Sequence, residues 1–193
     1  AAIWLSGLLG KNPQAANQIA LNLSSMTFMI AMGLGVAAMV RVGNQKGLLE
    51  FKELRRIAFS IFMIATLFAV VFAILFFIFS GILPKIYLDL NDPTKMVDNY
   101  EVITIASKLL LIAAVFQITD TIQVVALGAL RGMQDVKIPT FITFVSYWLI
   151  GFPISYYLSL YTDYKSSGIW IGLLAGLSAS GILLFIRFNY LSN

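Results

Sequence analysis

Five apolar runs divide this chain, and each of them is long enough to cross a lipid bilayer. A helix needs about 20 predominantly apolar residues to span a hydrocarbon core of about 30 Å. The runs occupy residues 15–42, 54–83, 101–130, 138–161 and 167–190. With 60% hydrophobic and 11% charged residues, the chain leaves little sequence for a soluble domain. The runs therefore predict an all-α integral membrane protein, a polytopic helix bundle with five full transmembrane helices.

A sixth apolar stretch, from Ala1 to Gly10, is too short to span a bilayer. Ten residues of helix cover only about 15 Å. The stretch also lacks the initiator Met, the basic segment and the cleavage-site pattern of a signal peptide. We therefore expect the chain to begin inside a helix. Residues 1–193 would then form a single transmembrane bundle, a fragment with five full helices and part of a sixth.

The basic residues fall between the runs or near their ends, and their placement predicts how the chain is oriented. With short connections and antiparallel neighbours, two sets of basic residues lie on opposite sides of the membrane. The larger set is Arg41, Lys46, Lys52, Arg55, Arg56, Arg131, Lys137 and Arg187, and the smaller is Lys11, Lys85, Lys95 and Lys165. The positive-inside rule places the larger set, and with it the C-terminus, in the cytoplasm. The net charge of +4 thus indicates topology in a lipid bilayer, and we expect no nucleic-acid partner.

The chain contains neither cysteine nor histidine. Their absence excludes thiolate and imidazole metal sites, a Ser-His-Asp arrangement and a cysteine nucleophile. An enzyme is therefore the least favoured reading, and no cofactor is expected. Proton or cation chemistry in this chain would have to use carboxylates, amides, hydroxyls and carbonyls.

Asp120 is the only carboxylate in the apolar stretch from Leu109 to Leu130. An ionised Asp at the middle of a membrane helix costs about 2.5–3.5 kcal/mol on translocon scales, and such residues usually mark ion or substrate paths. Residues three apart on a helix lie within about 60° of one another, so Gln117, Asp120 and Gln123 share one face. The alternative is that another helix satisfies the Asp120 charge for packing alone.

A stripe of polar and thioether side chains follows one side of the helix predicted for the first run. Its members are Gln18, Asn22, Ser25, Met29 and Met32. The amides could tie helices together through hydrogen bonds, worth about 1 kcal/mol each in membranes. Alternatively, the stripe lines a cavity, in which thioethers would accommodate ligands of variable shape.

The last two runs carry features that bear on helix shape and packing. Pro153 lies well inside the fourth run and predicts a kink, either a static bend or a hinge. Trp148, near the middle of the same helix, could stack on an organic cation in a cavity, contact lipid or pack against protein. In the last run, small residues at four-residue spacing predict a close helix contact within the same protein. These residues are Gly168, Gly172, Gly176 and Ser180.

Two segments carry a family resemblance: QIALNLSSMTFMIAMGLGVAAMVRVGNQKG, from Gln18 to Gly47, and QITDTIQVVALGALRGMQDVKIPTFITFVSYWLIGFPISYYL, from Gln117 to Leu158. They resemble the multidrug and toxic compound extrusion (MATE) family, in its NorM-like branch. The first is similar to the eighth helix of that family and the connection after it, and the second to its tenth and eleventh helices. The resemblance implies that this chain is the C-terminal lobe of a twelve-helix transporter. Two such six-helix lobes form a V around a central cavity and alternate between outward-open and inward-open states.

The resemblance further implies a secondary active antiporter in a bacterial cytoplasmic (inner) membrane. It would export organic cations and other amphipathic drugs in exchange for Na⁺ or H⁺. In that family the aspartate preceding Gln-Val-Val belongs to the cation site, and that position here is Asp120, the candidate Na⁺ ligand. Gln117 and Gln123 would be its hydrogen-bonding neighbours, and the remaining cavity-lining candidates are Gln18, Asn22, Met29 and Trp148. A glutamate that usually completes the site would lie just upstream of Ala1, and the missing N-terminal lobe would be a partner.

Two other functions fit a chain of this kind. A flippase for lipid-linked sugars would share the multi-helix architecture, but its pyrophosphate-bearing substrates call for a long cationic groove. Away from the ends of the runs, the charged residues are instead Asp120 and, one or two helical turns from one end, Lys108. A non-transporting membrane assembly subunit could pair Asp120 with a partner's Lys or Arg.

Overall fold

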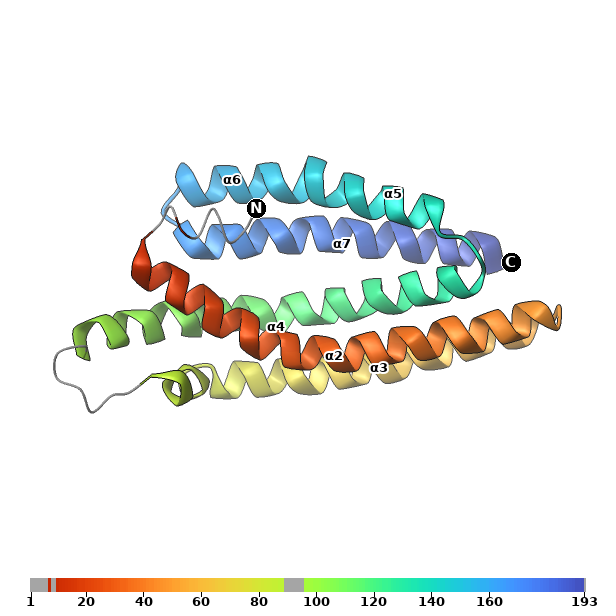
Figure 1. Cartoon of the computed structure of the whole chain (residues 1–193), viewed down its shortest axis with the longest axis horizontal. Coiled ribbons are helices and arrows are strands. Elements are labelled where there is room, and N and C mark those ends of the chain that lie inside the picture. The colour runs from red at the N-terminus through yellow and green to blue at the C-terminus, as the bar shows by residue number, and fades with distance from the viewer. Residues whose placement is uncertain (1–6, 8–9, 89–95, 193) are drawn as a thin grey trace.

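The computed structural model describes Gly7, residues 10–88 and residues 96–192 (Figure 1). The helices are α2 (Lys11–Gly47), α3 (Phe51–Phe79), α4 (Met96–Gly132), α5 (Lys137–Val145), α6 (Phe152–Leu160) and α7 (Lys165–Ser192). A π-helical segment, Ser146–Gly151, joins α5 to α6, and a short 3₁₀ helix, Leu83–Tyr87, follows α3. Counting α5 to α6 as one, five helices in the described ranges are long and apolar enough to cross a membrane. The predicted all-α membrane bundle is confirmed.

The partial helix predicted for residues 1–10 lies outside the described residues, apart from Gly7 and Gly10. The other predicted runs each correspond to one helix, with shifted ends. α2 begins at Lys11 and ends at Gly47, beyond the apolar run, because a helix continues past the lipid-facing residues into polar sequence. α3 ends at Phe79, four residues before the run does, and Pro84 lies in the first turn of the 3₁₀ helix that follows.

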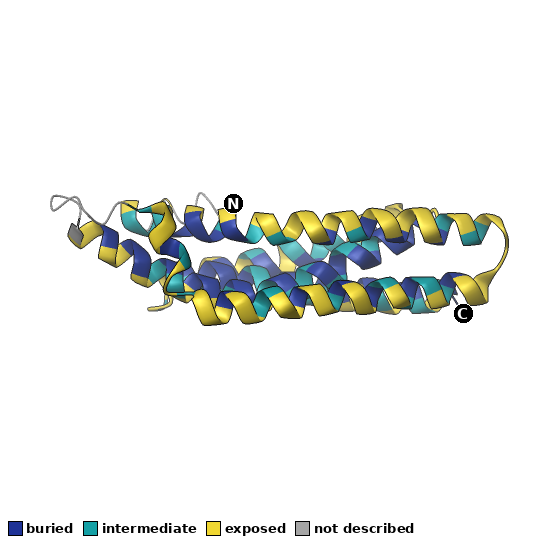
Figure 2. Ribbon diagram, turned by 90° about the horizontal axis from the view of Figure 1, so that it is seen from below, coloured by how far each residue is buried: buried dark blue, intermediate teal, exposed yellow. Residues whose placement is uncertain are grey.

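α4 lies at the centre of the bundle. α2 crosses it diagonally and α3 and α7 flank it, whereas α5 and α6 lie along α7 (Figure 1). Two apolar clusters fill the spaces between α4 and its neighbours, one towards each end of the bundle. Buried residues occur where helices face one another, and exposed ones surround the bundle (Figure 2), as expected for helices whose outer surface meets lipid rather than water.

Glycines allow the two closest helix contacts. At the crossing of α2 and α4, a Cβ on Gly128 would collide with the backbone carbonyl of Gly35, so only glycine fits there. On α7, Cβ atoms at Gly168, Gly172 and Gly176 would all meet α6 or the π-helical segment. The predicted small-residue ridge therefore packs within this chain, as expected.

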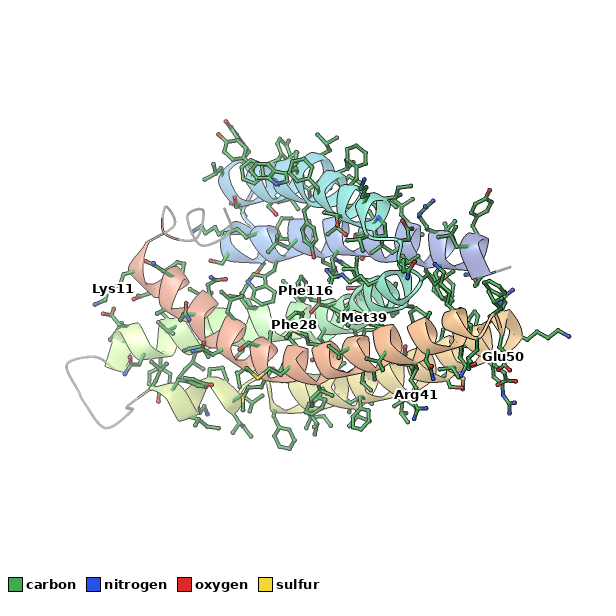
Figure 3. The ribbon with its side chains drawn as sticks, turned by 45° about the vertical axis from the view of Figure 1, so that its right-hand side comes forward. Lys11, Phe28, Met39, Arg41, Glu50 and Phe116 are labelled. Atoms are coloured by element: carbon green, nitrogen blue, oxygen red, sulfur yellow. The ribbon has the colours of Figure 1, made fainter. Side chains whose placement is uncertain are left out.

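The predicted larger set of basic residues gathers at one end of the bundle. Lys46 donates a hydrogen bond to the backbone carbonyl of Met133, and Arg187 Nε lies 2.7 Å from Asp135 Oδ2. These contacts bring together the α2–α3 turn, the α4–α5 turn and the end of α7. Lys11 lies at the other end of the bundle from Arg41 and Glu50 (Figure 3). Which side of the membrane each end occupies stays a prediction.

The π-helical segment Ser146–Gly151 ends two residues before Pro153, which is the second residue of α6. A proline removes one backbone hydrogen bond and crowds the preceding turn, and a wider π-helical turn is one way in which a helix accommodates such a defect. The structure thus shows the local irregularity that Pro153 predicts. A hinge motion at this point stays a prediction.

Candidate functional site

Asp120 lies at the gap between α2 and α7. On α4, Val124 contacts α2 at Gly35, and Gln123 is close to Gly181 of α7. Successive residues of a helix are rotated by about 100° around its axis, so the Asp120 side chain projects between the direction of Val124, which faces α2, and that of Gln123, which faces α7. Ile122, on nearly the opposite side of α4, lines a groove between α3 and α7 instead. The Asp120 side chain is partly exposed on this face of α4, so part of it is accessible from outside the bundle.

Tyr147 brings a second helix to this position. Its hydroxyl donates a hydrogen bond to Gln123 Oε1 at 3.3 Å, and it interacts electrostatically with the Asp120 carboxylate. Gln123 is buried. Tyr147 belongs to the π-helical segment, far from Asp120 in sequence, and no spacing or charge pattern in the sequence marks it. We call these three residues, Asp120, Gln123 and Tyr147, the Asp120 site. They bring a carboxylate, an amide and a hydroxyl together.

Gln117 points to a different part of the bundle. It lines a cavity of about 10 Å³ between α2, α3 and α4, together with Thr27 and Thr121. Both side-chain amide atoms of Gln117 are buried and have no hydrogen-bond partner among the described residues. Gln117 therefore shares a helix with Asp120 but directs its amide towards α2 and α3. Its predicted role beside the carboxylate stays a prediction.

The polar stripe on α2 lies on the exposed side of that helix. Gln18 Nε2 donates to Asn22 Oδ1 at 3.3 Å, within the same helix, and Met29 is 72% exposed. Two other amides tie α2 to neighbouring helices: Asn17 accepts a hydrogen bond of 2.9 Å from Trp170 Nε1 of α7, and Asn12 Nδ2 donates to Glu101 Oε2 of α4 at 2.6 Å. The stripe thus does not contact the Asp120 site in this structure. It forms an outer surface of the bundle.

Trp148 belongs to an aromatic row along the outer face of α5 and α6. Its ring centroid lies 6.1 Å from that of Phe144 and 5.8 Å from that of Phe152, and Phe152 is followed by Tyr156. Trp148 is 55% exposed. The neighbours of its ring are therefore other aromatic rings, and the outer face of Trp148 remains open to lipid, to another part of the protein or to a ligand.

These features define a polytopic helical membrane protein with a carboxylate, Asp120, in the apolar part of its central helix. The MatE family matches residues 1–157, and the chain belongs to that family. The resemblance carried by the two quoted segments is thereby confirmed.

Known relatives extend the comparison to nearly the whole chain. The probable multidrug resistance protein NorM of Agrobacterium fabrum is 40% identical over 188 residues, which cover 97% of this chain and 40% of that protein. The multidrug resistance protein MdtK of Proteus mirabilis is 41% identical over 184 residues, covering 93% of this chain and 38% of the relative. The chain therefore spans about 40% of the length of these relatives.

Solved structures show the same fold. An outward-facing conformation of a multidrug resistance MATE family transporter aligns with a TM-score of 0.82, and an inward-facing conformation with 0.83. Each is 16% identical and covers 99% of this chain, which spans 40% and 42% of the respective structures. The arrangement of helices in this chain is thus the arrangement found in one part of a MATE transporter.

Proposed function

We propose that this chain forms the C-terminal lobe of an efflux transporter that exchanges organic cations and other amphipathic compounds for Na⁺ or H⁺ by alternating access. One observation carries the proposal: Asp120 is the only charged residue from Leu109 to Leu130, and it lies partly exposed at the gap between α2 and α7. The names of the relatives, which are multidrug resistance proteins, support the same class of cargo. The protein would reside in a bacterial inner membrane with the C-terminus in the cytoplasm.

The proposed coupling rests on competition for the Asp120 carboxylate. A carboxylate can either take up a proton or bind Na⁺, and in both cases it is no longer available to a cationic drug. A ligand shifts an equilibrium between two conformations only through its different affinities for them. Ion and drug would therefore favour different conformations of the transporter if each binds Asp120 in only one of them.

A Na⁺ ion at Asp120 would need further oxygen ligands. Within the described ranges no three Asp, Glu, His or Cys side chains lie close enough together to hold a metal ion, so the additional ligands from these residues would be amide, hydroxyl or carbonyl oxygens. Gln123 and Tyr147 supply an amide and a hydroxyl at the Asp120 site. The exposed stripe with Gln18, Asn22 and Met29 would face the cavity shared with the other lobe.

The test is Asp120→Asn in the full-length transporter, purified and reconstituted in liposomes. We expect ion-driven efflux of a fluorescent organic cation to fall by about 5–150-fold, the range typical of coupling between two ligands. Asp98→Asn is the matched control, because Asp98 is an exposed carboxylate near the start of the same helix. Undiminished efflux by Asp120→Asn at normal expression would contradict the proposed role. Flux with this protein as the single component would also exclude an assembly subunit.

A further inference from the structure

An open apolar groove of about 890 Å³ lies between α3 and α7, on the side of α4 that faces away from Asp120. α3 contributes Phe59, Met63 and Val70, α7 contributes Ile182 and Phe185, and all the other lining residues except Thr66 and Gly181 are also apolar. Several of these side chains are largely exposed, with Met63 at 73% and Ile182 at 61%. The groove is thus an apolar surface that the described residues do not cover.

The dimensions of the groove suit a lipid chain. From Phe59 to Val70 the helix rises by about 16 Å, close to half of a hydrocarbon core of about 30 Å. The groove therefore runs through about one leaflet of the bilayer, parallel to the acyl chains around it. A hydrocarbon chain lying in it would fill space between α3 and α7 that neither helix fills.

Basic residues lie at one end of the groove. The basic residues precede Phe59 in α3 by seven, four and three positions: Lys52, Arg55 and Arg56. At this spacing they lie on the side of α3 that carries Phe59. The Arg55 guanidinium is 5.6 Å from the centroid of the Phe59 ring. It also donates to Asn189 Oδ1 at 3.5 Å, so it reaches α7 across the end of the groove.

Within the described residues, the start of α3 carries two acidic side chains, Glu50 and Glu53, beside these three basic ones. Glu53 lies 3.7 Å from Arg56 in an exposed pair, and such pairs contribute little. Lys52 and Arg56 are exposed. The end of the groove is therefore positively charged, and guanidinium groups bind phosphate through paired hydrogen bonds.

We propose that the groove binds an anionic phospholipid, with one acyl chain along α3 and α7 and the headgroup phosphate held by Lys52, Arg55 and Arg56. Basic clusters directly beside a membrane helix recognise anionic headgroups, and here the cluster continues into an apolar channel of matching length. The binding site is separate from Asp120, so it does not depend on the proposed transport function.

The test uses the full-length protein in vesicles of phosphatidylcholine and phosphatidylglycerol, with brominated acyl chains on one lipid or the other. The chain contains no cysteine, so Thr66→Cys, in a background without other cysteines, can carry a single fluorophore inside the groove. Leu149→Cys is the control. Leu149 is 70% exposed. It lies 12 residues from Lys137, and Thr66 lies 11 residues from Arg55 at the same end of the bundle, so the two labels lie at similar depths in the bilayer.

We expect the label at Thr66 to be quenched about fivefold more effectively by brominated phosphatidylglycerol than by brominated phosphatidylcholine. At Leu149 the two lipids should quench equally. The double variant Lys52→Gln/Arg56→Gln should abolish the preference, and higher salt should weaken it. Arg131→Gln/Lys137→Gln, which removes the same charge from exposed residues at the same end of the bundle, should leave it unchanged.

Three outcomes would overturn the proposal. One is equal quenching by the two lipids at Thr66, and another is a preference that survives the loss of Lys52 and Arg56. The third is weak quenching by both lipids at Thr66 with normal quenching at Leu149, because protein or another ligand would then fill the groove.

Discussion

The polar side chains near Asp120 differ in how their hydrogen-bonding groups are satisfied. Gln123 accepts a hydrogen bond from Tyr147, whereas neither amide atom of Gln117 has a partner among the described residues. A buried polar group left without a partner costs about 1–3 kcal/mol. Without another partner, the buried Gln117 amide would lower the stability of the folded chain by an amount of this order.

Replacing Gln117 by Met should separate stability from function. The substitution removes the buried amide at similar side-chain volume, so we expect the free energy of unfolding to rise by about 1 kcal/mol, and efflux to fall if the amide serves the ligand. Thermal unfolding and liposome efflux measure the two effects. Gln123→Met is the control and should be destabilising, because it leaves the Tyr147 hydroxyl without its acceptor. A less stable Gln117→Met protein would show that the amide is satisfied after all.

Single residues were predictable from the sequence where cost or spacing marked them. Asp120 stands out because a charge in an apolar run is expensive, and helical spacing points to Gln123. The same spacing also selects Gln117, whose amide is directed towards α2 and α3 instead. Tyr147 and Asn17 were missed, because their contacts depend on which helix lies opposite and at what rotation. Asn17 has one visible signal: it lies among Ala16 and Ala20, small residues that indicate the buried side of α2.

At the scale of elements, the apolar runs predicted each helix but not its type. The length of an apolar run reflects the thickness of the bilayer. It does not indicate whether a given turn is α-, π- or 3₁₀-helical. The early end of α3 at Phe79 and the π-helical segment Ser146–Gly151 were therefore not predicted. Pro153 indicated a defect in the fourth run, but a missing hydrogen bond does not specify which geometry compensates for it.

The crossing of α2 and α4 gives a prediction about helix contact. Gly128→Ala would force a Cβ against the backbone of Gly35, which cannot move aside as a side chain can. We expect it to lower the free energy of unfolding by about 1–3 kcal/mol. Gly33→Ala, on α2 near the same crossing, points into open space and should instead add about 0.5–1 kcal/mol. Thermal inactivation of the two variants in lipid checks the opposite signs. Equal stability would mean that the helices do not approach this closely.

At the scale of the whole molecule, the charged end of the bundle ties its helices together. Asp135 follows α4, and its contact with Arg187 fastens the α4–α5 turn to α7; both side chains are mostly buried. Arg187→Gln should lower the free energy of unfolding by about 1.5–3 kcal/mol, the value of a hydrogen bond to a charged group. Arg41→Gln changes an exposed residue at the same end and should have little effect. Chemical unfolding of both variants measures the difference, and similar effects would argue against a structural role for the Arg187–Asp135 pair.

The orientation of the molecule can be tested with cysteines at its two ends. Leu49, in the α2–α3 turn, is 75% exposed, and Tyr161, after α6, is 68% exposed. The positive-inside rule predicts that a membrane-impermeant maleimide added to intact cells labels Tyr161→Cys and not Leu49→Cys. Leu49→Cys should react only after the cells are opened. The reverse pattern would invert the proposed topology.

The antiparallel order of the helices and the grouping of basic residues were predictable, because short connections force successive helices to alternate in direction. The central position of α4 was not predictable from apolar content. α3 is the most apolar of the five membrane-length helices, yet a smaller share of it than of α4 is buried. In a membrane the outer surface is apolar too, so hydropathy does not distinguish a core helix from a lipid-facing one.

The π-helical segment has a consequence for insertions and deletions. A π-helical turn contains one residue more than an α-helical turn would need. Because the wider turn accommodates that residue, deleting one residue from Ser146–Gly151 would leave a continuous α-helix with α5 and α6 in nearly the same rotational phase. Ser155, whose hydroxyl donates to the Ile169 carbonyl at 3.0 Å, would still face α7. At this point the chain can therefore carry one residue more or one fewer without turning α6 away from the glycines of α7, whereas a deletion inside α5 or α6 would rotate the two helices relative to one another by about 100°.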